Sequence, residues 1–170
     1  MKALIVIDML NDFVLKNAPL EVPKARGIIK NIRSEISKAH RKNIPVIYVC
    51  DTHKKYDKEF RIWPAHAIKG TEGQKVVREL KPGIKDYIVP KTTYSGFFKT
   101  GLERLLKKLD IKDLTLTGVC TNICILFTAS DATLRGYNVT VLKDCVAALT
   151  GEDHEFALRQ MKDVLKAKVV

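Results

Sequence analysis

Two cysteines lie four residues apart in the stretch GVCTNICILFTASDA, Gly118 to Ala132, where a strand-forming run gives way to a helical pattern. Cys124 follows Thr121 and Asn122, which are both common at helix starts, so its thiol would lie in the first helical turn. There the helix dipole and free backbone N–H groups would lower the pKa of the thiol. The same N–H groups could receive the oxyanion of a tetrahedral intermediate. A buried structural cysteine explains this residue equally well when it is taken alone.

Two further groups suited to such chemistry follow apolar runs elsewhere in the chain. Asp8 comes after ALIVI, where desolvation would raise the pKa of its carboxyl toward the range useful for proton transfer. Lys91 comes after YIVP and could hold negative charge. A cysteine, a carboxylate that takes its proton and a lysine would make a nucleophilic amidase or esterase site. A turn-capping aspartate and a surface lysine are the plainer explanations of the two residues taken singly.

A third group of polar residues lies in the long connection DTHKKYDKEFRIWPAHAIKGTEG, residues 51–73, which holds two of the four histidines and the only tryptophan. Asp51 and His53 alternate, so both side chains can point the same way if the chain is extended. His66 follows thirteen residues later, and Glu59 could add another oxygen. One carboxylate and two imidazoles suit zinc, iron or manganese and leave positions open for water or substrate. The D-x-H pattern also occurs by chance, and surface histidines are common.

These residues need a scaffold, and the apolar pattern of the chain indicates one. Five short, β-branched runs are nearly continuous, as buried parallel strands are: residues 2–7, 45–50, 87–90, 114–119 and 139–142. Segments of helical period lie between and after them. Their apolar faces are Ile28, Ile32, Ile36 and Ala39 in the first, Leu102, Leu105, Leu106 and Leu109 in a later one, and Ala157, Met161, Val164 and Leu165 in the last. The last helix would begin after Thr150 with TGED as a capping box.

Alternation of strand and helix predicts the fold class α/β: a single three-layer α/β/α domain over residues 1–170, Rossmann-like, with a mainly parallel sheet of five to six strands. Ligands of such open sheets bind beyond the carboxyl ends of the strands. Asp8, Asp51, Lys91 and the turn from Cys120 to Cys124 all follow predicted strands. We therefore expect these residues to gather at one edge of the sheet.

Composition narrows the classes of function. The 170 residues are 46% hydrophobic and 29% charged, as in a globular protein with one sizeable core. The formal net charge is +11, but Lys and Arg are spread along the chain, which argues against nucleic-acid binding as the main function. ALIVI is too short to span a bilayer or to serve in an export signal. We therefore expect a cytoplasmic protein with no membrane role and reduced thiols at Cys50, Cys120, Cys124 and Cys145.

Four motifs resemble those of the isochorismatase-like cysteine hydrolases, and within them the nicotinamidase and pyrazinamidase branch, over essentially the whole chain. ALIVIDMLNDFV resembles the opening strand and D-x-x-x-D-F turn of that family, and DTHKKYDKEFRIWPAH resembles its metal loop. PKTTYSGF resembles its lysine segment, and GVCTNICILFTASDA its G-V-x-T-[DN]-x-C nucleophile turn. The motifs occur in the same order as in the family.

The resemblance implies a catalytic triad of Asp8, Lys91 and Cys124. It also implies a cis peptide bond between Val119 and Cys120, and an oxyanion hole made by the backbone N–H groups of Cys120 and Cys124. By the same resemblance, one divalent metal ion, with zinc as the first expectation and iron or manganese as alternatives, would be bound by Asp51, His53, His66 and, as in some members, Glu59. The substrate pocket would be lined by Phe13, Trp63 and Tyr94.

The activity implied is hydrolysis of nicotinamide, and of pyrazinamide, to the free acid and ammonia through a thioester. The expected partners are a small-molecule amide substrate and further copies of the chain, as a homodimer or a larger homo-oligomer. A related cysteine amidohydrolase acting on a carbamoyl or ureido compound is an alternative, and a non-catalytic family member is another. The family's frequent D-W-H-P is DTHK here, and Ala67 stands where a cysteine often follows the last histidine. These departures alter the pocket wall, on which the identity of the substrate depends.

Overall fold

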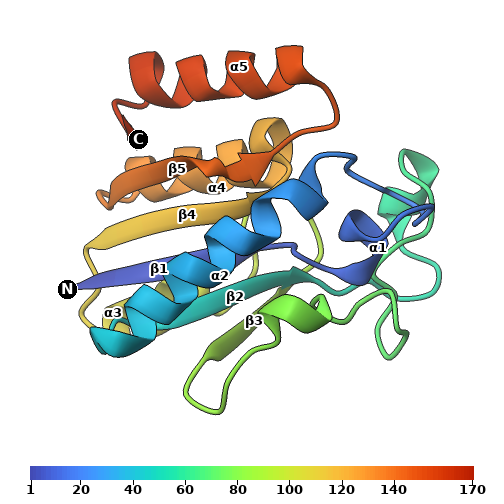
Figure 1. Cartoon of the computed structure of the whole chain (residues 1–170), viewed down its shortest axis with the longest axis horizontal. Coiled ribbons are helices and arrows are strands. Elements are labelled where there is room, and N and C mark those ends of the chain that lie inside the picture. The colour runs from blue at the N-terminus through green and yellow to red at the C-terminus, as the bar shows by residue number, and fades with distance from the viewer.

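A six-stranded parallel sheet forms the centre of the structure, a computed structural model that describes all of residues 1–170. The strands lie in the order β3-β2-β1-β4-β5-β6 (Figure 1). Their bounds are β1 Lys2–Ile7, β2 Val46–Asp51, β3 Tyr87–Lys91, β4 Asp113–Val119, β5 Asn138–Ala147 and β6 Lys168–Val169. The sheet confirms the predicted α/β fold. Five strands overlap the five predicted runs, whereas β6 has only two residues and is too short to show a pattern.

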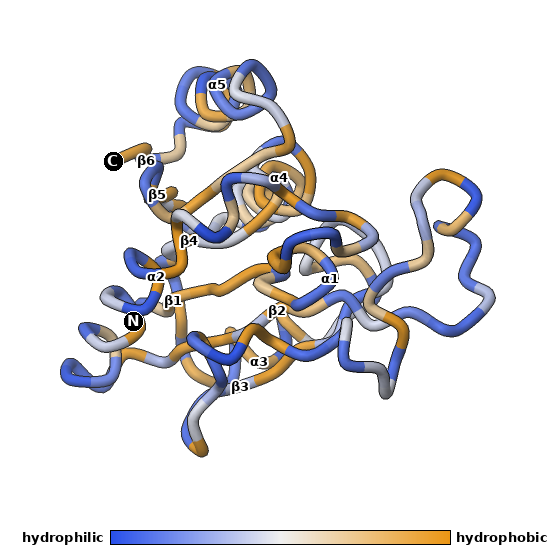
Figure 2. The backbone as a smooth tube through the Cα atoms, turned by 45° about the vertical axis from the view of Figure 1, so that its right-hand side comes forward, coloured by the Kyte–Doolittle hydropathy of each residue, from blue (hydrophilic) through white to orange (hydrophobic).

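Helices cover both faces of the sheet (Figure 1). They are α1 Asn11–Val14, α2 Ala25–Arg41, α3 Leu102–Lys108, α4 Leu126–Leu134 and α5 Gly151–Arg159. One apolar cluster joins the sheet to α1 and α2, and a second joins its other face to α3, α4 and α5. Because both faces of the sheet are buried, β1 is a continuous apolar run after Lys2, which Figure 2 shows in orange. None of the helices combines the length and apolar character needed to cross a lipid bilayer.

The predicted apolar faces of the helices are mostly buried. In α2 all four predicted residues lie in the core, and in the last helix Ala157 and Met161 do. Val164 is an exception, because its side chain is 63% exposed. The chain from Gln160 to Val164 is π-helical, and the wider turn rotates Val164 out of the apolar face. Thr150 caps α5 as predicted: its hydroxyl oxygen lies 3.1 Å from the N–H of Asp153, which donates to it.

Close contact between β1 and β4 depends on Gly118, which comes just before the nucleophile turn. A Cβ atom at Gly118 would lie 1.9 Å from the carbonyl oxygen of Ile7, and its φ is +114°. Glycine alone tolerates both conditions. The pairing of β4 with β5 also shifts register between Leu116 and Gly118. The end of β4 therefore lies directly beside the end of β1, which leads to Asp8.

Candidate active site

Three buried side chains predicted to act together do meet at the carboxyl ends of the strands: Asp8, Lys91 and Cys124. The Lys91 Nζ atom lies 2.7 Å from Oδ2 of Asp8 and 3.5 Å from Sγ of Cys124. Asp8 follows β1, and its φ of +52° turns the chain out of the strand. The ammonium group therefore lies between a carboxylate and a thiol, within reach of both.

Asp51 is a fourth member of this cluster. It was expected at the same edge of the sheet, but its side chain was assigned only to the metal loop. Lys91 and Asp51 are register partners in β3 and β2, and Nζ of Lys91 lies 2.5 Å from Oδ1 of Asp51. The backbone N–H of Asp51 also donates to Oδ1 of Asp8 at 2.8 Å. Asp8, Asp51 and Cys124 bring their ligand atoms within 4.8 Å of one another, but the Lys91 ammonium already provides the cation of this group.

Burial sets the proton affinities of the triad. It raises the pKa of Asp8 to about 6, with the Asp51 charge adding to the effect and Lys91 opposing it. Burial also raises the pKa of the Cys124 thiol well above its ordinary value, although Lys91 opposes this. The expectation of a lowered thiol pKa is therefore wrong for the free enzyme, because desolvation outweighs the charge of Lys91. The resting pair is a neutral thiol beside a carboxylate that is ionised above about pH 6.

The nucleophile turn has an unusual backbone. The peptide bond between Val119 and Cys120 is cis, as the resemblance implied. Residues Thr121–Ile125 form a π-helical turn that runs into α4, so Cys124 lies in the first helical turn as predicted. The Cys120 carbonyl accepts from the N–H of Ile125 at 3.1 Å, whereas the Cys120 N–H donates to no other group of the chain. That N–H is therefore available to a bound oxyanion.

The residues expected to bind metal also lie together. Asp51, His53, Glu59 and His66 bring one ligand atom each within 4.8 Å of one another. The Oδ2 atom of Asp51 lies 3.7 Å from Nε2 of His53 and 3.7 Å from Nε2 of His66, and Oε1 of Glu59 lies 3.9 Å from Nε2 of His66. These separations are too long for hydrogen bonds. They suit donors that face one shared ion.

The protonation pattern of the histidines fits a divalent cation. His53 is fully buried, and neither of its ring nitrogens has a hydrogen-bond partner. His66 places Nδ1 2.7 Å from the carbonyl oxygen of Pro64, so Nδ1 carries the proton and Nε2 presents a lone pair. Oδ2 of Asp57 lies 3.3 Å from Nδ1 of His53, without hydrogen-bond geometry. Sequence reasoning missed Asp57, whose spacing of four residues from His53 was the available signal.

Asp12 fixes the chain that follows His66, a function that the D-x-x-x-D-F motif did not reveal. Oδ2 of Asp12 accepts from the N–H of Ala67 at 2.8 Å. A Cβ atom at Gly73 would lie 2.1 Å from the Asp12 carboxylate, so only glycine leaves room for it. Ala67 has a φ of +44° and is fully buried. The segment after β1 that contains Asp12 thus holds the end of the metal loop at Ala67 in place.

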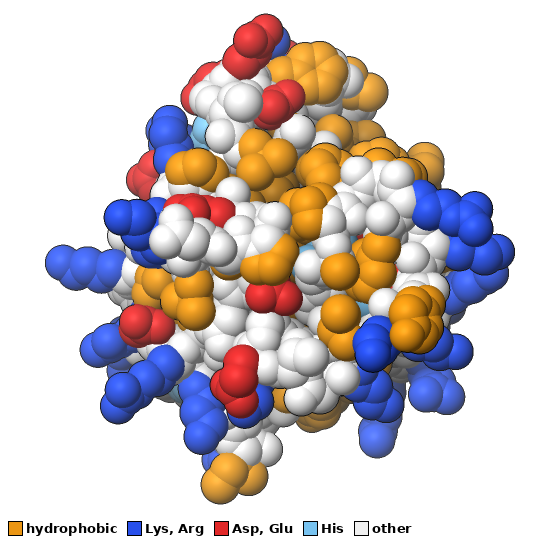
Figure 3. Space-filling view, turned by 90° about the vertical axis from the view of Figure 1, so that its right-hand side faces the viewer, with side chains coloured by type: hydrophobic (Ala, Val, Ile, Leu, Met, Phe, Trp, Pro, Cys, Tyr) orange, Lys and Arg blue, Asp and Glu red, His pale blue; other side chains and the backbone are white.

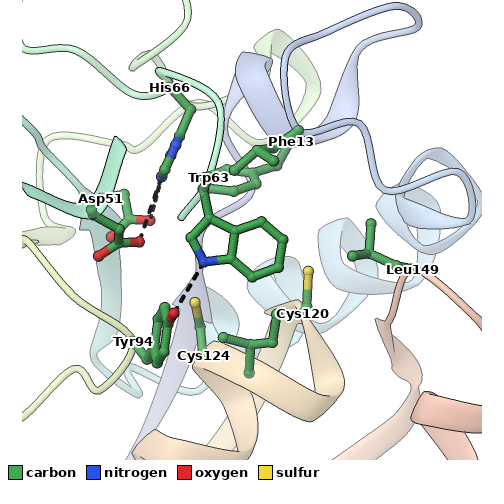
Figure 4. Close-up of a pocket in the computed structure, with 11 residues that line it drawn as sticks. Phe13, Asp51, Trp63, His66, Tyr94, Cys120, Cys124 and Leu149 are labelled. Atoms are coloured by element: carbon green, nitrogen blue, oxygen red, sulfur yellow. Dashed lines mark hydrogen bonds and ion pairs between the residues drawn. The ribbon is translucent and has the colours of Figure 1, made fainter. Parts of the chain in front are cut away.

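A small pocket lies over Cys124. The carboxyl ends of the strands face the viewer in Figure 3, where apolar side chains gather toward the centre and Lys and Arg lie around the edge. The lining includes all three predicted residues, Phe13, Trp63 and Tyr94 (Figure 4). The Trp63 indole N–H donates to the Tyr94 hydroxyl at 3.0 Å. The complete lining is Phe13, Leu20, Asp51, Glu59, Trp63, His66, Tyr94, Cys120, Ile123, Cys124 and Leu149.

Three of these lining residues were missed from the sequence: Leu20, Ile123 and Leu149. Leu20 and Leu149 lie in connections outside every motif, and Ile123 lies within the nucleophile turn without polar chemistry of its own. No lysine or arginine lines the pocket. The walls are therefore mainly apolar and aromatic, and their polar groups are the two thiols, the Trp63–Tyr94 pair, and Asp51, Glu59 and His66.

Comparison with known proteins gives a consistent result over the whole chain. Residues 2–169 match the family described as the isochorismatase domain. The pyrazinamidase/nicotinamidase of Streptococcus mutans superposes with a TM-score of 0.95 at 34% identity, covering 100% of both chains. The N-carbamoylsarcosine amidase of Thermoplasma acidophilum gives 0.90 at 36% identity, covering 99% of this chain and 94% of the other. The pyrazinamidase of Pyrococcus horikoshii, solved in complex with zinc, gives 0.94 at 32%, covering 99% and 98%.

Proposed function

The chain belongs to the isochorismatase family, and on that premise we propose that it is a metal-assisted nicotinamidase. In this proposal the Cys124 thiol attacks the carboxamide of nicotinamide or pyrazinamide and forms a thioester. Ammonia leaves, and water then releases the free acid. Asp8 and Lys91 are the other members of the triad, and the backbone N–H groups of Cys120 and Cys124 form the oxyanion hole.

Proton transfer begins at Asp8. Its carboxylate accepts the Cys124 proton as the sulfur attacks the carbonyl carbon, because a free thiolate is disfavoured in this buried site. Lys91 contacts both groups, so its charge stabilises the sulfur as negative charge develops there. The carbonyl oxygen becomes an oxyanion and accepts hydrogen bonds from the two backbone N–H groups.

Collapse of the tetrahedral intermediate breaks the carbon–nitrogen bond. Asp8 donates the proton that it took from Cys124 to the leaving nitrogen, which departs as ammonia and leaves a thioester on Cys124. A water molecule then gives a proton to Asp8 and attacks the thioester carbonyl. Release of the acid returns that proton to the sulfur, so Asp8 and Cys124 are restored to their starting states.

Asp51, His53, Glu59 and His66 would hold one divalent ion beside the pocket. Two carboxylates and two neutral imidazoles would balance its charge. When bound, such an ion would accept the pyridine nitrogen as a ligand and so help to orient the carboxamide. Zinc is the first choice, because the pyrazinamidase of Pyrococcus horikoshii was solved with zinc.

Support for a neutral aromatic substrate comes from the walls of the pocket. Phe13, Trp63 and Tyr94 provide flat apolar surface, and the lining holds no lysine or arginine. A carbamoyl amino acid carries a carboxylate, for which the pocket wall offers no cationic side chain. An uncharged heteroaromatic amide has no such group to desolvate. This observation favours nicotinamide over carbamoyl compounds.

A carbamoyl or ureido amide is the second candidate, because the N-carbamoylsarcosine amidase of Thermoplasma acidophilum is 36% identical to this chain. Such a substrate would use the same three catalytic side chains. Its carboxylate would need a cation, and the metal site is the only one that the pocket could supply.

The two candidates are separated by measuring kcat/KM for nicotinamide, pyrazinamide and N-carbamoylsarcosine with the zinc-loaded enzyme. We expect kcat/KM for nicotinamide to exceed that for N-carbamoylsarcosine by about 100-fold or more, since no cationic side chain of the pocket wall pairs with the carboxylate of the latter. A preference for N-carbamoylsarcosine would overturn the proposal in favour of the second candidate. Equal turnover of both would contradict the argument from the pocket wall.

A further inference from the structure

A hydrogen bond joins the nucleophile turn to the last helix: Oγ1 of Thr121 lies 2.9 Å from Nδ1 of His154. We propose that His154 is a positioning residue that holds the oxyanion hole in place through Thr121. The proposal rests on the function proposed above, because it assigns the support of that same site. No motif in the sequence pointed to His154.

Thr121 is well placed to transmit this effect. It is fully buried, and His154 is the only hydrogen-bond partner of its hydroxyl. It directly follows Cys120, whose N–H is free for an oxyanion. A buried hydroxyl that loses its partner is unfavourable, so the turn would move to find another. Cys120 would then move with Thr121, and the direction of its N–H would change.

The other end of the contact is also fixed. Thr150 caps α5 by accepting from the N–H of Asp153 at 3.1 Å, and the His154 N–H donates to the Thr150 carbonyl at 3.2 Å. Leu149, the residue before Thr150, lines the substrate pocket. The connection that leads into α5 therefore supplies part of the pocket wall, and the first turn of α5 supports the turn that carries the nucleophile.

The Cys124 thiol itself has a separate partner, since Lys91 contacts its sulfur at 3.5 Å. Loss of the His154 contact should therefore impair stabilisation of the oxyanion more than it impairs the attacking sulfur. Two probes separate these effects. Iodoacetamide alkylates a thiol without forming an oxyanion, whereas pyridine-3-carbaldehyde would add to Cys124 and form a thiohemiacetal whose oxygen would occupy the oxyanion hole.

The experiment compares wild type with His154→Ala, His154→Gln and the neighbouring control Glu155→Ala, whose side chain is exposed on the same helix. For His154→Ala we expect kcat for nicotinamide and affinity for the aldehyde to fall by about tenfold, consistent with loss of one hydrogen bond that acts at a distance. KM and the alkylation rate should stay within about twofold, because neither depends on the oxyanion. His154→Gln should restore most of the kcat, since its amide can bond the Thr121 hydroxyl.

A second pair of variants keeps the test valid if His154→Ala folds poorly. Thr121→Val should lower kcat as much as His154→Ala does, and Thr121→Ser should retain the wild-type kcat. The double variant Thr121→Val with His154→Ala should lose no more kcat than either single variant. Unchanged kcat in His154→Ala and Thr121→Val would overturn the proposal. Equal falls in kcat and alkylation rate would also overturn it, since they would show a general disturbance of the site.

Failure of the proposed function would be seen separately, in the wild type. If wild-type enzyme releases no ammonia from nicotinamide but hydrolyses N-carbamoylsarcosine, the same variant ratios are measured on that amide. A tenfold fall in kcat with an unchanged alkylation rate would still support the assignment of His154, and no fall would overturn it.

Discussion

Lys91 makes ion pairs with two carboxylates, one in the proposed triad and one in the proposed metal site. It binds Asp8 at 2.7 Å and Asp51 at 2.5 Å. Burial alone would lower the pKa of Lys91, but Asp51 and Asp8 outweigh it and raise that pKa well above its ordinary value. The two carboxylates therefore hold Lys91 in its charged form. Its charge is what allows two buried carboxylates to lie so close together.

Cys120 is expected to act through its backbone and not through its thiol. The thiol is buried, and burial raises its pKa to about 12, so it stays neutral and unreactive. Cys120→Ala keeps the backbone N–H, and we expect it to retain kcat/KM for nicotinamide within about threefold of wild type. Steady-state ammonia release measures this. Activity as low as that of a Cys124 variant would contradict this assignment, because it would show that the Cys120 thiol itself takes part in the chemistry.

The activity should depend on pH through Asp8. Its pKa is raised to about 6, and only the ionised carboxylate can take the Cys124 proton. We therefore expect kcat/KM to fall about tenfold per pH unit below about pH 6 and to level off above it. Because Asp8 also binds its proton more tightly in the folded state, its own contribution to stability declines as pH rises from about 4 to above 6. A rate profile from about pH 4.5 to 8 that stays flat through pH 6 would contradict the role of Asp8 as base.

At the scale of elements, the approach of β4 to β1 determines where the nucleophile turn lies. Gly118→Ala would place a methyl group 1.9 Å from the Ile7 carbonyl oxygen at a φ of +114°. We expect it to lower the free energy of unfolding by about 3 kcal/mol or more, from overpacking and backbone strain together. Equilibrium unfolding in urea measures the change.

Gly136→Ala is the matched control for that measurement. Gly136 also has a positive φ, +80°, but no atom lies within 4 Å of the Cβ position. The strained backbone conformation alone should lower the free energy of unfolding by about 1 kcal/mol. Equal destabilisation by the two substitutions would show that the contact with Ile7 does not limit the packing of β4 on β1.

Most of the element order could be predicted from the sequence, because β-branched runs and helical periods are local signals. The strands β1 to β5 coincide with such runs, and the spacing of Ile28, Ile32 and Ile36 correctly predicted the buried face of α2. The π-helical ends could not be predicted in the same way. An extra residue per turn, as in the Gln160–Val164 segment, leaves no trace in an apolar pattern that is already irregular.

The candidate site could be predicted only where polar residues stood beside strand ends or in motifs. Asp8, Lys91 and Cys124 satisfied both conditions. The link from Lys91 to Asp51 depends on strand register, and the contact between Thr121 and His154 joins segments 33 residues apart. The thiol pKa was misjudged for a similar reason: a helix start is visible in sequence, whereas the complete burial that raises the pKa of Cys124 is a property of the packed molecule.

At the scale of the whole molecule, metal binding should stabilise the fold, because the ligands come from the end of β2 and from a long loop that only the folded chain brings together. Free zinc at about 100 times its Kd should add about 2.7 kcal/mol. For a chain of 170 residues this raises Tm by about 5 to 10 °C relative to the chelated protein.

Thermal unfolding with a chelator and then with zinc restored measures that shift. His66→Ala removes one donor and should abolish most of it, whereas His40→Ala, on α2, should leave it unchanged. His40 contacts Asp86 and not the cluster. A zinc-dependent shift of the same size in His66→Ala would place the metal elsewhere.

The proposal that this family member hydrolyses nicotinamide with Cys124 as nucleophile is tested most directly by ammonia release. The initial rate is measured with nicotinamide and zinc-loaded enzyme, for wild type and Cys124→Ala side by side, with nicotinic acid quantified in the same samples. We predict equal amounts of ammonia and nicotinic acid from wild type, and a kcat at least about 1,000-fold lower in Cys124→Ala. Release of ammonia by Cys124→Ala at a rate near that of wild type, or none by wild type, would contradict the account.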